Sequence, residues 1–201
     1  MCGRYFIDPT PAMLPVIEAM NRSPLIQAFQ QNGEVMTRGE IRPTNVAPVL
    51  ASARNGSRAV FPMKWGFTGK TLLINSRAET AASRVTFREA WQSHRCAVPA
   101  SWYFEWEHLD AEGGKKKIGD RFRLRPRGSG ITWLCGLYRI ENGLPCYVIL
   151  TREPGEGIRF LHDRMPLMLP EEYAKEWIRP DADPAELVRA AQTDIQYERL
   201  G

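Results

Sequence analysis

The first residues of the chain, Met1-Cys2-Gly3-Arg4, place a cysteine at the second position. A small second residue is the circumstance in which an initiator methionine can be removed, and its removal exposes a 1,2-aminothiol. Such an amine has a pKa of about 7.7 to 8.0 and the thiol one of about 8.5, so both nucleophiles are available near neutral pH. An aldehyde condenses with the amine to a Schiff base, and the thiol then closes a five-membered thiazolidine. Alternatively, Cys2 is only a small residue near a frayed chain end.

Three further segments each place a polar side chain among apolar neighbours: residues 75–80 (NSRAET), 102–106 (WYFEW) and 161–166 (LHDRMP). Burial of Glu105 in its aromatic strand would raise its pKa toward values useful for general acid and base work. Histidine titrates near neutral pH, so His162 can move a proton, and Asn75 can orient a substrate by hydrogen bonds. The ordinary alternatives are a solvent-facing glutamate, a structural loop histidine and a turn asparagine.

The composition indicates one soluble globular domain that covers residues 1–201. A content of 43% hydrophobic and 25% charged residues excludes wholesale disorder and a fibrous architecture. No apolar run reaches the roughly 18 residues that span a bilayer, and the N-terminus lacks the basic-then-apolar order of a secretory signal. We therefore expect a cytoplasmic protein without a membrane partner.

The cysteines and histidines are scattered along the chain, and no two cysteines form a CxxC pair. Their positions are Cys2, Cys96, Cys135 and Cys146, and His94, His108 and His162. Metal sites and disulfide frameworks have recognisable spacings that these positions lack. We therefore expect neither a disulfide framework nor a metal site, and the sequence indicates no cofactor.

Basic residues suggest a polyanion partner only weakly. The net charge of +4 is common among proteins that bind no nucleic acid. Four arginines alternate with apolar residues and would line one face of a strand: Arg121, Arg123, Arg125 and Arg127. Such a face could follow a phosphate backbone, but a solvated outer face is the favoured interpretation. Lys115-Lys116-Lys117 predicts a charged hairpin tip.

Strands and helices are predicted in a mixed order. Strands are expected over Arg4–Ile7, Ala59–Trp65, Leu72–Asn75, Cys96–Pro99 and Trp102–Trp106, with three more between Arg121 and Thr151. Helices are expected over Met13–Met20, Leu25–Gln31 (ended by Asn32-Gly33), Glu79–Ser93, Pro170–Ile178 and Pro184–Thr193. Prolines at both ends of residues 42–48 predict an ordered, extended loop. Because strands and helices do not alternate regularly, the pattern favours an α+β fold over a doubly wound sheet.

Taken together, these segments resemble the SRAP family, the SOS response-associated peptidase proteins. The resemblance covers six segments in the order of the family: Met1–Tyr5, Asn45–Pro48, Lys64–Gly66, Asn75–Thr80, Trp102–Trp106 and His162–Pro166. Chance agreement of all six is very improbable. The resemblance implies an α+β fold of curved, mostly antiparallel, barrel-like sheets with peripheral helices.

The resemblance also implies a chemistry. After self-processing removes Met1, the amine of Cys2 attacks the open-chain aldehyde of an abasic site in single-stranded DNA, and the thiol completes a thiazolidine. The lesion is thereby shielded. By the same resemblance, Asn75 positions the reacting end, Glu105 transfers protons, and His162 assists proton transfer, including in slow reversal. The implied protein is a monomer that is nucleoid-associated when it is bound to DNA and that takes part in the response to DNA damage.

Basic positions of the family match Arg4, Arg77 and Arg164, which are expected to hold the DNA backbone, and Arg84 is a further candidate. The loop between Gly66 and Asn75 is shorter than in many relatives. Fewer side chains are therefore available to stack on the last base pair of a junction between single and double strands.

Two other functions remain open from the sequence. The first is a peptidase or amidohydrolase that uses Cys2 as an N-terminal nucleophile, and the second is a non-covalent binder of modified or single-stranded DNA. A heat-stable, stoichiometric DNA adduct that is lost in Cys2→Ala distinguishes covalent capture from both.

Overall fold

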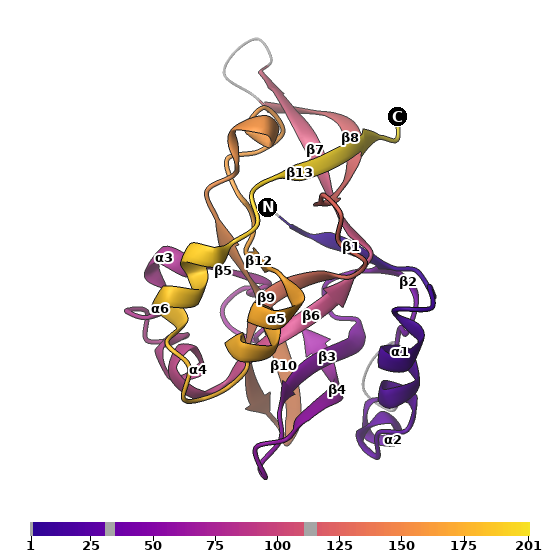
Figure 1. The fold of residues 1–201 in the computed structure, drawn as a ribbon, viewed down its shortest axis with the longest axis vertical. Helices are drawn as coiled ribbons and strands as arrows, with labels where there is room; N and C mark the ends of the chain where they lie inside the picture. The colour runs from indigo at the N-terminus through magenta and orange to yellow at the C-terminus, as the bar shows by residue number, and fades with distance from the viewer. Residues whose placement is uncertain (1, 31–34, 111–115) are drawn as a thin grey trace.

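Two β-sheets form the body of the computed structural model, which describes residues 2–30, 35–110 and 116–201. The first sheet has five strands in the order β13 (Ile195–Arg199), β8 (Lys116–Pro126), β7 (Trp102–Asp110), β1 (Arg4–Ile7) and β2 (Gly39–Ile41). Its neighbouring strands are all antiparallel. Because β1 pairs with a strand on each side, the beginning of the chain is held inside this sheet (Figure 1).

The second sheet closes into a five-stranded barrel. Its ring consists of β10 (Leu144–Arg152), β4 (Arg58–Trp65), β3 (Val46–Ser52), β6 (Arg95–Ala100) and β9 (Thr132–Glu141), and β9 pairs back with β10. Only the β10–β4 pairing of the ring is parallel. The short strands β5 (Asn75–Arg77) and β11 (Met165–Pro166) pair with β10, and β12 (Met168–Leu169) pairs with β9.

Short helices lie around the outside of the barrel (Figure 1). On one side are α1 (Leu14–Asn21) and α2 (Leu25–Gln30), and on the other are α3 (Ala78–Ala81), α4 (Arg88–Ser93), α5 (Glu171–Trp177) and α6 (Pro184–Leu187). Two 3₁₀ turns are η1 (Glu156–Ile158) and η2 (Val188–Ala190). The predicted α+β fold of curved, mostly antiparallel, barrel-like sheets with peripheral helices is thus confirmed. Within the described ranges, no helix is long and apolar enough to cross a membrane.

The predicted helix over Glu79–Ser93 is wrong as a single element, because the chain forms α3 and α4 with a break between them. The break contains Ser83, Val85 and Thr86, which are poor helix formers. Val85 is 84% exposed, so packing does not compensate for its low propensity. Helical geometry resumes at the start of α4, where the Trp91 N–H donates to the Phe87 carbonyl at 2.8 Å.

Other boundaries also differ from the predictions. The strand expected over Leu72–Asn75 begins only at Asn75, and Leu73 forms an isolated bridge with Phe67. The helix expected over Pro184–Thr193 becomes α6 followed by η2. The end expected for the second helix, Gln31 to Gly33, lies outside the described residues, as does Lys115 of the predicted hairpin tip.

The extended loop predicted over residues 42–48 ends earlier than expected, because β3 begins at Val46 and includes Pro48. Pro48 lies opposite Pro62 of β4 in the antiparallel ladder. Neither residue has an N–H group to donate. Because the two prolines lie opposite each other, no other residue of the ladder faces a position that lacks a donor.

An aromatic contact joins the first sheet to the inside of the barrel. The Tyr5 hydroxyl of β1 hydrogen-bonds the Tyr147 hydroxyl of β10 at 2.7 Å, and both side chains are fully buried. Trp65 packs against both rings, with centroid separations of 5.3 Å to Tyr5 and 6.1 Å to Tyr147. This contact fixes β1 relative to the barrel.

A buried arginine holds the helices on one side of the barrel. Arg95 begins β6 and is 2% exposed. Its guanidinium donates to five backbone carbonyls at 2.5 to 2.9 Å, those of Trp91, Gln92, Trp177, Arg179 and Ala182. These carbonyls belong to the last turns of α4 and α5 and to the loop after α5, so one side chain caps two helix ends.

Candidate active site

Cys2 lies just before β1, next to β7. Arg4 pairs with Phe104 and Tyr5 with Tyr103, and continuing this antiparallel register places the residues before Arg4 beside Glu105. The Cys2 side chain is fully buried, and its Sγ is 3.8 Å from the Arg4 carbonyl oxygen. Burial raises the pKa of the Cys2 thiol far above its usual range, and the negative charge of Glu105 raises it further. The expectation of a freely available thiolate at neutral pH is therefore wrong for this state of the chain.

Asn75 reaches Cys2 from the other sheet. It begins β5, which runs parallel to β10 with Asn75 opposite Ile149. Its Nδ2 donates a hydrogen bond to the Cys2 carbonyl at 3.0 Å. Its Oδ1 is buried and has no hydrogen-bond partner among the described residues, so an acceptor remains available there. The structure thus brings two of the four predicted catalytic residues into direct contact.

Glu105 is buried in β7. Its exposed fraction is 5%, and Tyr103 on the same side of the strand is 1% exposed. The alternative of a solvent-facing glutamate is therefore wrong. Burial raises the pKa of the Glu105 carboxyl, as the aromatic sequence around it predicts. A carboxyl group whose pKa is raised is a better proton donor than an exposed glutamate and, once ionised, a stronger base.

His162 lies in the loop between η1 and β11, and its side chain is 12% exposed. Its Nδ1 is 2.6 Å from Asp163 Oδ1 and 3.0 Å from the Arg164 amide nitrogen. These two contacts need opposite tautomers, because a carboxylate requires a proton on Nδ1 and an N–H donor requires a lone pair. Only the Arg164 contact has hydrogen-bond geometry, so Nδ1 accepts from that N–H and Asp163 is a close acidic neighbour of the ring.

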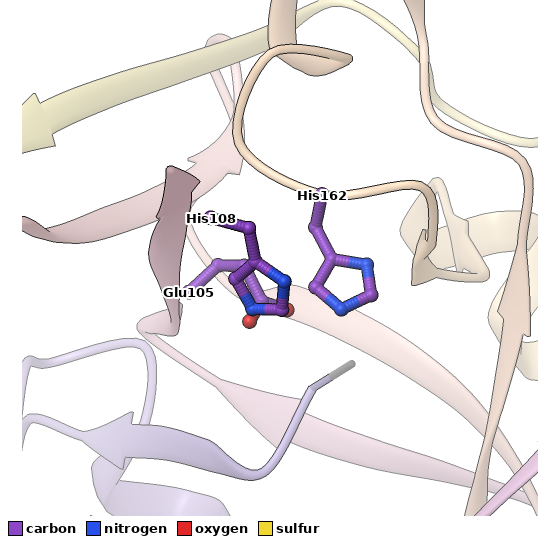
Figure 2. Close-up of side chains that lie close together, drawn as sticks. All are labelled: Glu105, His108 and His162. Carbon is purple, nitrogen blue, oxygen red and sulfur yellow. The ribbon is translucent and has the colours of Figure 1, made fainter. Parts of the chain in front are cut away.

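His108, which no sequence motif indicates, also lies at this site. Its ring lies 4.6 Å from that of His162 between centroids, and one ligand atom each of Glu105, His108 and His162 lie within 4.8 Å of one another. Figure 2 shows two of these side chains extending from β7 and the third from the loop that faces it. Regular strand alternation puts residues 105 and 108 on opposite faces. A register irregularity between Trp106 and His108 breaks that alternation, and no local pattern predicts it.

The predicted DNA-binding arginines differ in their surroundings. Arg77 and Arg84 are exposed, at the start of α3 and between α3 and α4. Arg4 is half-buried, and its Nε is 3.2 Å from Glu40 Oε1. The described contacts show no partner that all four guanidinium groups share. Their role in binding DNA stays a prediction.

Arg164 forms the strongest ion pair of these positions. Its two terminal nitrogens contact the two carboxylate oxygens of Glu79 at 2.9 and 2.7 Å, and one also donates to the Thr151 carbonyl at 2.7 Å. Partial burial raises the pKa of Glu79, but the hydrogen bonds from Arg164 outweigh burial and hold that pKa below its usual range. The pair ties the loop of His162 to α3, so Arg164 also positions that loop.

The alternating arginines of β8, with Arg127 just after it, form an outer face, as the favoured interpretation predicted. The intervening Phe122 and Leu124 are buried, whereas the arginines are half-buried or exposed. Acidic partners neutralise three of them: Arg121 pairs with Glu40, Arg123 with Glu198 and Arg127 with Asp194. Glu40 on β2, which the sequence analysis did not single out, contacts Arg4, Arg42 and Arg121.

Comparison with known proteins identifies the family. The sequence profile of the SOS response associated peptidase (SRAP) family matches residues 1–200. The chain belongs to the SRAP family. The resemblance drawn from the sequence motifs is thus confirmed.

Named relatives of this SRAP protein come from bacteria and a vertebrate. The abasic site processing protein YoqW of Bacillus subtilis (strain 168) is 35% identical over 92% of this chain and 83% of its own length. The abasic site processing protein YedK of Escherichia coli (strain K12) is 35% identical over 68% of this chain and 64% of its own length. The abasic site processing protein HMCES of Gallus gallus is 24% identical over 83% of this chain and 64% of its own.

Solved structures share the SRAP fold described above. A protein from Bacteroides thetaiotaomicron superimposes with a TM-score of 0.74 at 19% identity and covers 100% of this chain and 92% of its own. A phage-related protein from Bordetella bronchiseptica also superimposes with a TM-score of 0.74, at 22% identity, over 99% of this chain and 94% of its own. At these identities the likeness concerns the fold alone.

Proposed function

We propose that this protein captures abasic sites in single-stranded DNA covalently through Cys2, after Met1 is removed, and thereby shields the lesion. Relatives named abasic site processing proteins support the substrate. The observation that carries the chemistry is the contact of Asn75 Nδ2 with the Cys2 carbonyl at 3.0 Å, beside a buried glutamate. The arrangement fixes the first nucleophile of the mature chain where an acid–base group is available.

The first stage of the proposed reaction frees and uses the amine. Hydrolysis of the Met1–Cys2 peptide bond consumes one water and releases methionine. The amine of Cys2 then adds to the aldehyde carbon of the ring-opened deoxyribose, and the resulting carbinolamine loses water to give an imine. Glu105 is suited to donate the proton that leaves with this water, because its raised pKa keeps more of it protonated than an exposed glutamate. The buried Asn75 Oδ1 is suited to accept a hydrogen bond from the amine.

The second stage uses the thiol. Sulfur adds to the imine carbon, the thiol proton leaves, and the imine nitrogen gains a proton, so that the sum of both stages from the free amine is aldehyde plus aminothiol giving thiazolidine and one water. Because burial raises the pKa of the Cys2 thiol, a base must take this proton. Glu105, whose charge acts on that thiol, is the candidate base, and His162, grouped with Glu105, is a second proton carrier.

Burial of Cys2 also favours an unpaired substrate. A sugar carbon can reach a fully buried residue only if the DNA backbone bends into the site, which single strands allow at low cost. Exposed Arg77 and Arg84 and the half-buried Arg4 then supply positive charge for the neighbouring phosphates.

The deciding experiment incubates the protein with a single-stranded oligonucleotide that contains one abasic site. We expect a stoichiometric adduct that survives heat and denaturant, with the mass of the protein lacking Met1 plus the DNA minus one water. Cys2→Ala abolishes this adduct, whereas Cys146→Ala, which removes another buried thiol, keeps it. An undamaged oligonucleotide gives no adduct.

Each competing function predicts a different outcome of this experiment. An adduct that persists in Cys2→Ala, or whose mass maps to another residue, contradicts covalent capture through Cys2. Repeated turnover of peptides by wild type without an adduct indicates a peptidase. Retention of DNA that is equal in wild type and Cys2→Ala and is lost on denaturation indicates a non-covalent binder.

A further inference from the structure

Two imidazoles and a carboxylate converge beside Cys2, in a group that we call the His–Glu cluster: Glu105, His108 and His162. One ligand atom from each lies within 4.8 Å of the others. Figure 2 shows that the three side chains come from two different elements and point toward a common space. Sequence spacing gave no sign of this arrangement, because the cluster depends on the approach of a loop to β7.

We propose that the His–Glu cluster is a binding site for a zinc ion. Two histidines and one carboxylate form a ligand set of the kind that holds Zn²⁺ with a further coordination position open. Tetrahedral bonds of about 2.0 to 2.1 Å place ligand atoms about 3.4 Å apart. From a largest separation of 4.8 Å, modest side-chain rotations suffice, and the exposed His108 has room to make them.

The surroundings of His162 fit a metal ligand. Its Nδ1 accepts a hydrogen bond from the Arg164 amide at 3.0 Å, so the neutral ring carries its proton on Nε2. Zinc that binds at Nε2 requires this proton to move to Nδ1, where the Asp163 carboxylate, 2.6 Å away, can accept it. A carboxylate that accepts from one ring nitrogen while the other binds the metal is the usual support of a zinc-bound histidine. In Figure 2 one nitrogen of the His162 ring points away from His108 and Glu105.

Zinc at this position would act on the proposed function, and this part of the inference rests on it. Glu105 and His162 are the groups that move protons during capture, and neither can do so while its electron pair is bound to a metal. Zinc therefore inhibits adduct formation, and a chelator restores it. The ion is thus a reversible inhibitor of this SRAP protein.

The first test measures binding without DNA. Titration of the metal-free protein with Zn²⁺ by calorimetry, and with Co²⁺ by its visible absorption, is expected to give one site per chain. His108→Ala loses at least tenfold in affinity, whereas His94→Ala, which removes the histidine outside the cluster, binds as wild type does. Binding that is absent in wild type, or equally tight in His108→Ala, overturns the proposal.

Cys2 requires its own control, because a 1,2-aminothiol also chelates zinc. In Cys2→Ala we expect one Co²⁺ site that still depends on His108 and shows no sulfur-to-metal charge-transfer absorption. Loss of all binding in Cys2→Ala assigns the ion to the aminothiol and overturns the cluster.

The second test measures adduct formation with and without zinc, as a ratio within each variant. We expect zinc to slow capture at least tenfold in wild type and less than twofold in His108→Ala, and a chelator to restore the wild-type rate. An equal effect in both variants contradicts inhibition through the cluster. Failure of the proposed function itself is seen separately, as a missing adduct in the metal-free wild type.

Discussion

Substitution of Asn75 tests how the reactive end of the chain is held. Asn75→Ala removes the donor to the Cys2 carbonyl, a hydrogen bond of 3.0 Å that joins the two sheets. Cys2 is fully buried, so its carbonyl is left unpaired, which costs about 1 to 3 kcal/mol. This cost lowers the fraction of molecules in which Cys2 is held correctly, and the rate of capture falls with that fraction. The expected slowing is about 5- to 150-fold.

Most of this cost should appear in the rate and little in the stability of the fold. Residues before Arg4 lie outside β1 and can fray while the sheet and the barrel stay intact. A global loss of stability lowers the melting temperature by about 2 to 8 °C per kcal/mol, depending on domain size. We expect the melting temperature of Asn75→Ala to fall by much less than a global loss of about 1 to 3 kcal/mol would produce.

The assay is single-turnover adduct formation on an abasic oligonucleotide, resolved on a denaturing gel, with thermal unfolding of the same samples. Asn75→Asp keeps the size of the side chain but sets an acceptor against the Cys2 carbonyl, so it should be at least as slow as Asn75→Ala. Asn55→Ala removes an asparagine from an exposed turn and serves as the matched control. A capture rate of Asn75→Ala within twofold of wild type, or a loss fully explained by unfolding, refutes the reasoning.

Three further predictions concern charge and packing. Burial raises the pKa of Glu105, so its stabilising contribution is present below the ordinary glutamate pKa and is lost as the pH rises through the raised value. Glu105→Gln should therefore gain more stability at pH 8 than at pH 4, and it should slow capture. Equal gains at both pH values in thermal unfolding would count against this prediction. Arg164→Gln should weaken binding to single-stranded DNA and lower the slope of log affinity against log salt concentration by about one. Arg84→Gln should have the same effect without loss of stability. An unchanged slope for Arg164→Gln in fluorescence titrations would show that Arg164 serves only to pair with Glu79. Arg95→Met should destabilise the fold by about 3 to 5 kcal/mol in denaturant unfolding, because five carbonyls lose their donor. A loss of unfolding free energy below about 1 kcal/mol would show that water replaces the guanidinium.

Local periodicity predicted many of the elements, because alternation and helical spacing are properties of neighbouring residues. The strand over Arg4–Ile7 has the expected bounds, and the aromatic run before Glu105 does bury that carboxyl. The closure of the barrel is different in kind. It requires β10 to pair in parallel with β4, two segments far apart in the chain, and no local pattern encodes that pairing.

The site was predictable in part for the same reason. The motifs led to Cys2, Asn75, Glu105 and His162, and the structure brings Asn75 to Cys2 and His162 to Glu105. His108 was missed because regular alternation places it on the wrong face of β7, and only the register irregularity turns it toward His162. The expectation of no metal site relied on ligands close in sequence and stays a prediction, whereas the proposed zinc site uses ligands that only tertiary structure brings together.

The interior position of β1 has a practical consequence for anyone who handles this protein. A strand with a neighbour on each side, anchored to Tyr147 by the hydroxyl of Tyr5, cannot slide without breaking both ladders. If capture uses the amine of Cys2 as proposed, an affinity tag or a fused partner at the amino end blocks that amine. Fusions belong at the other end, where β13 lies at the edge of its sheet and Gly201 is exposed.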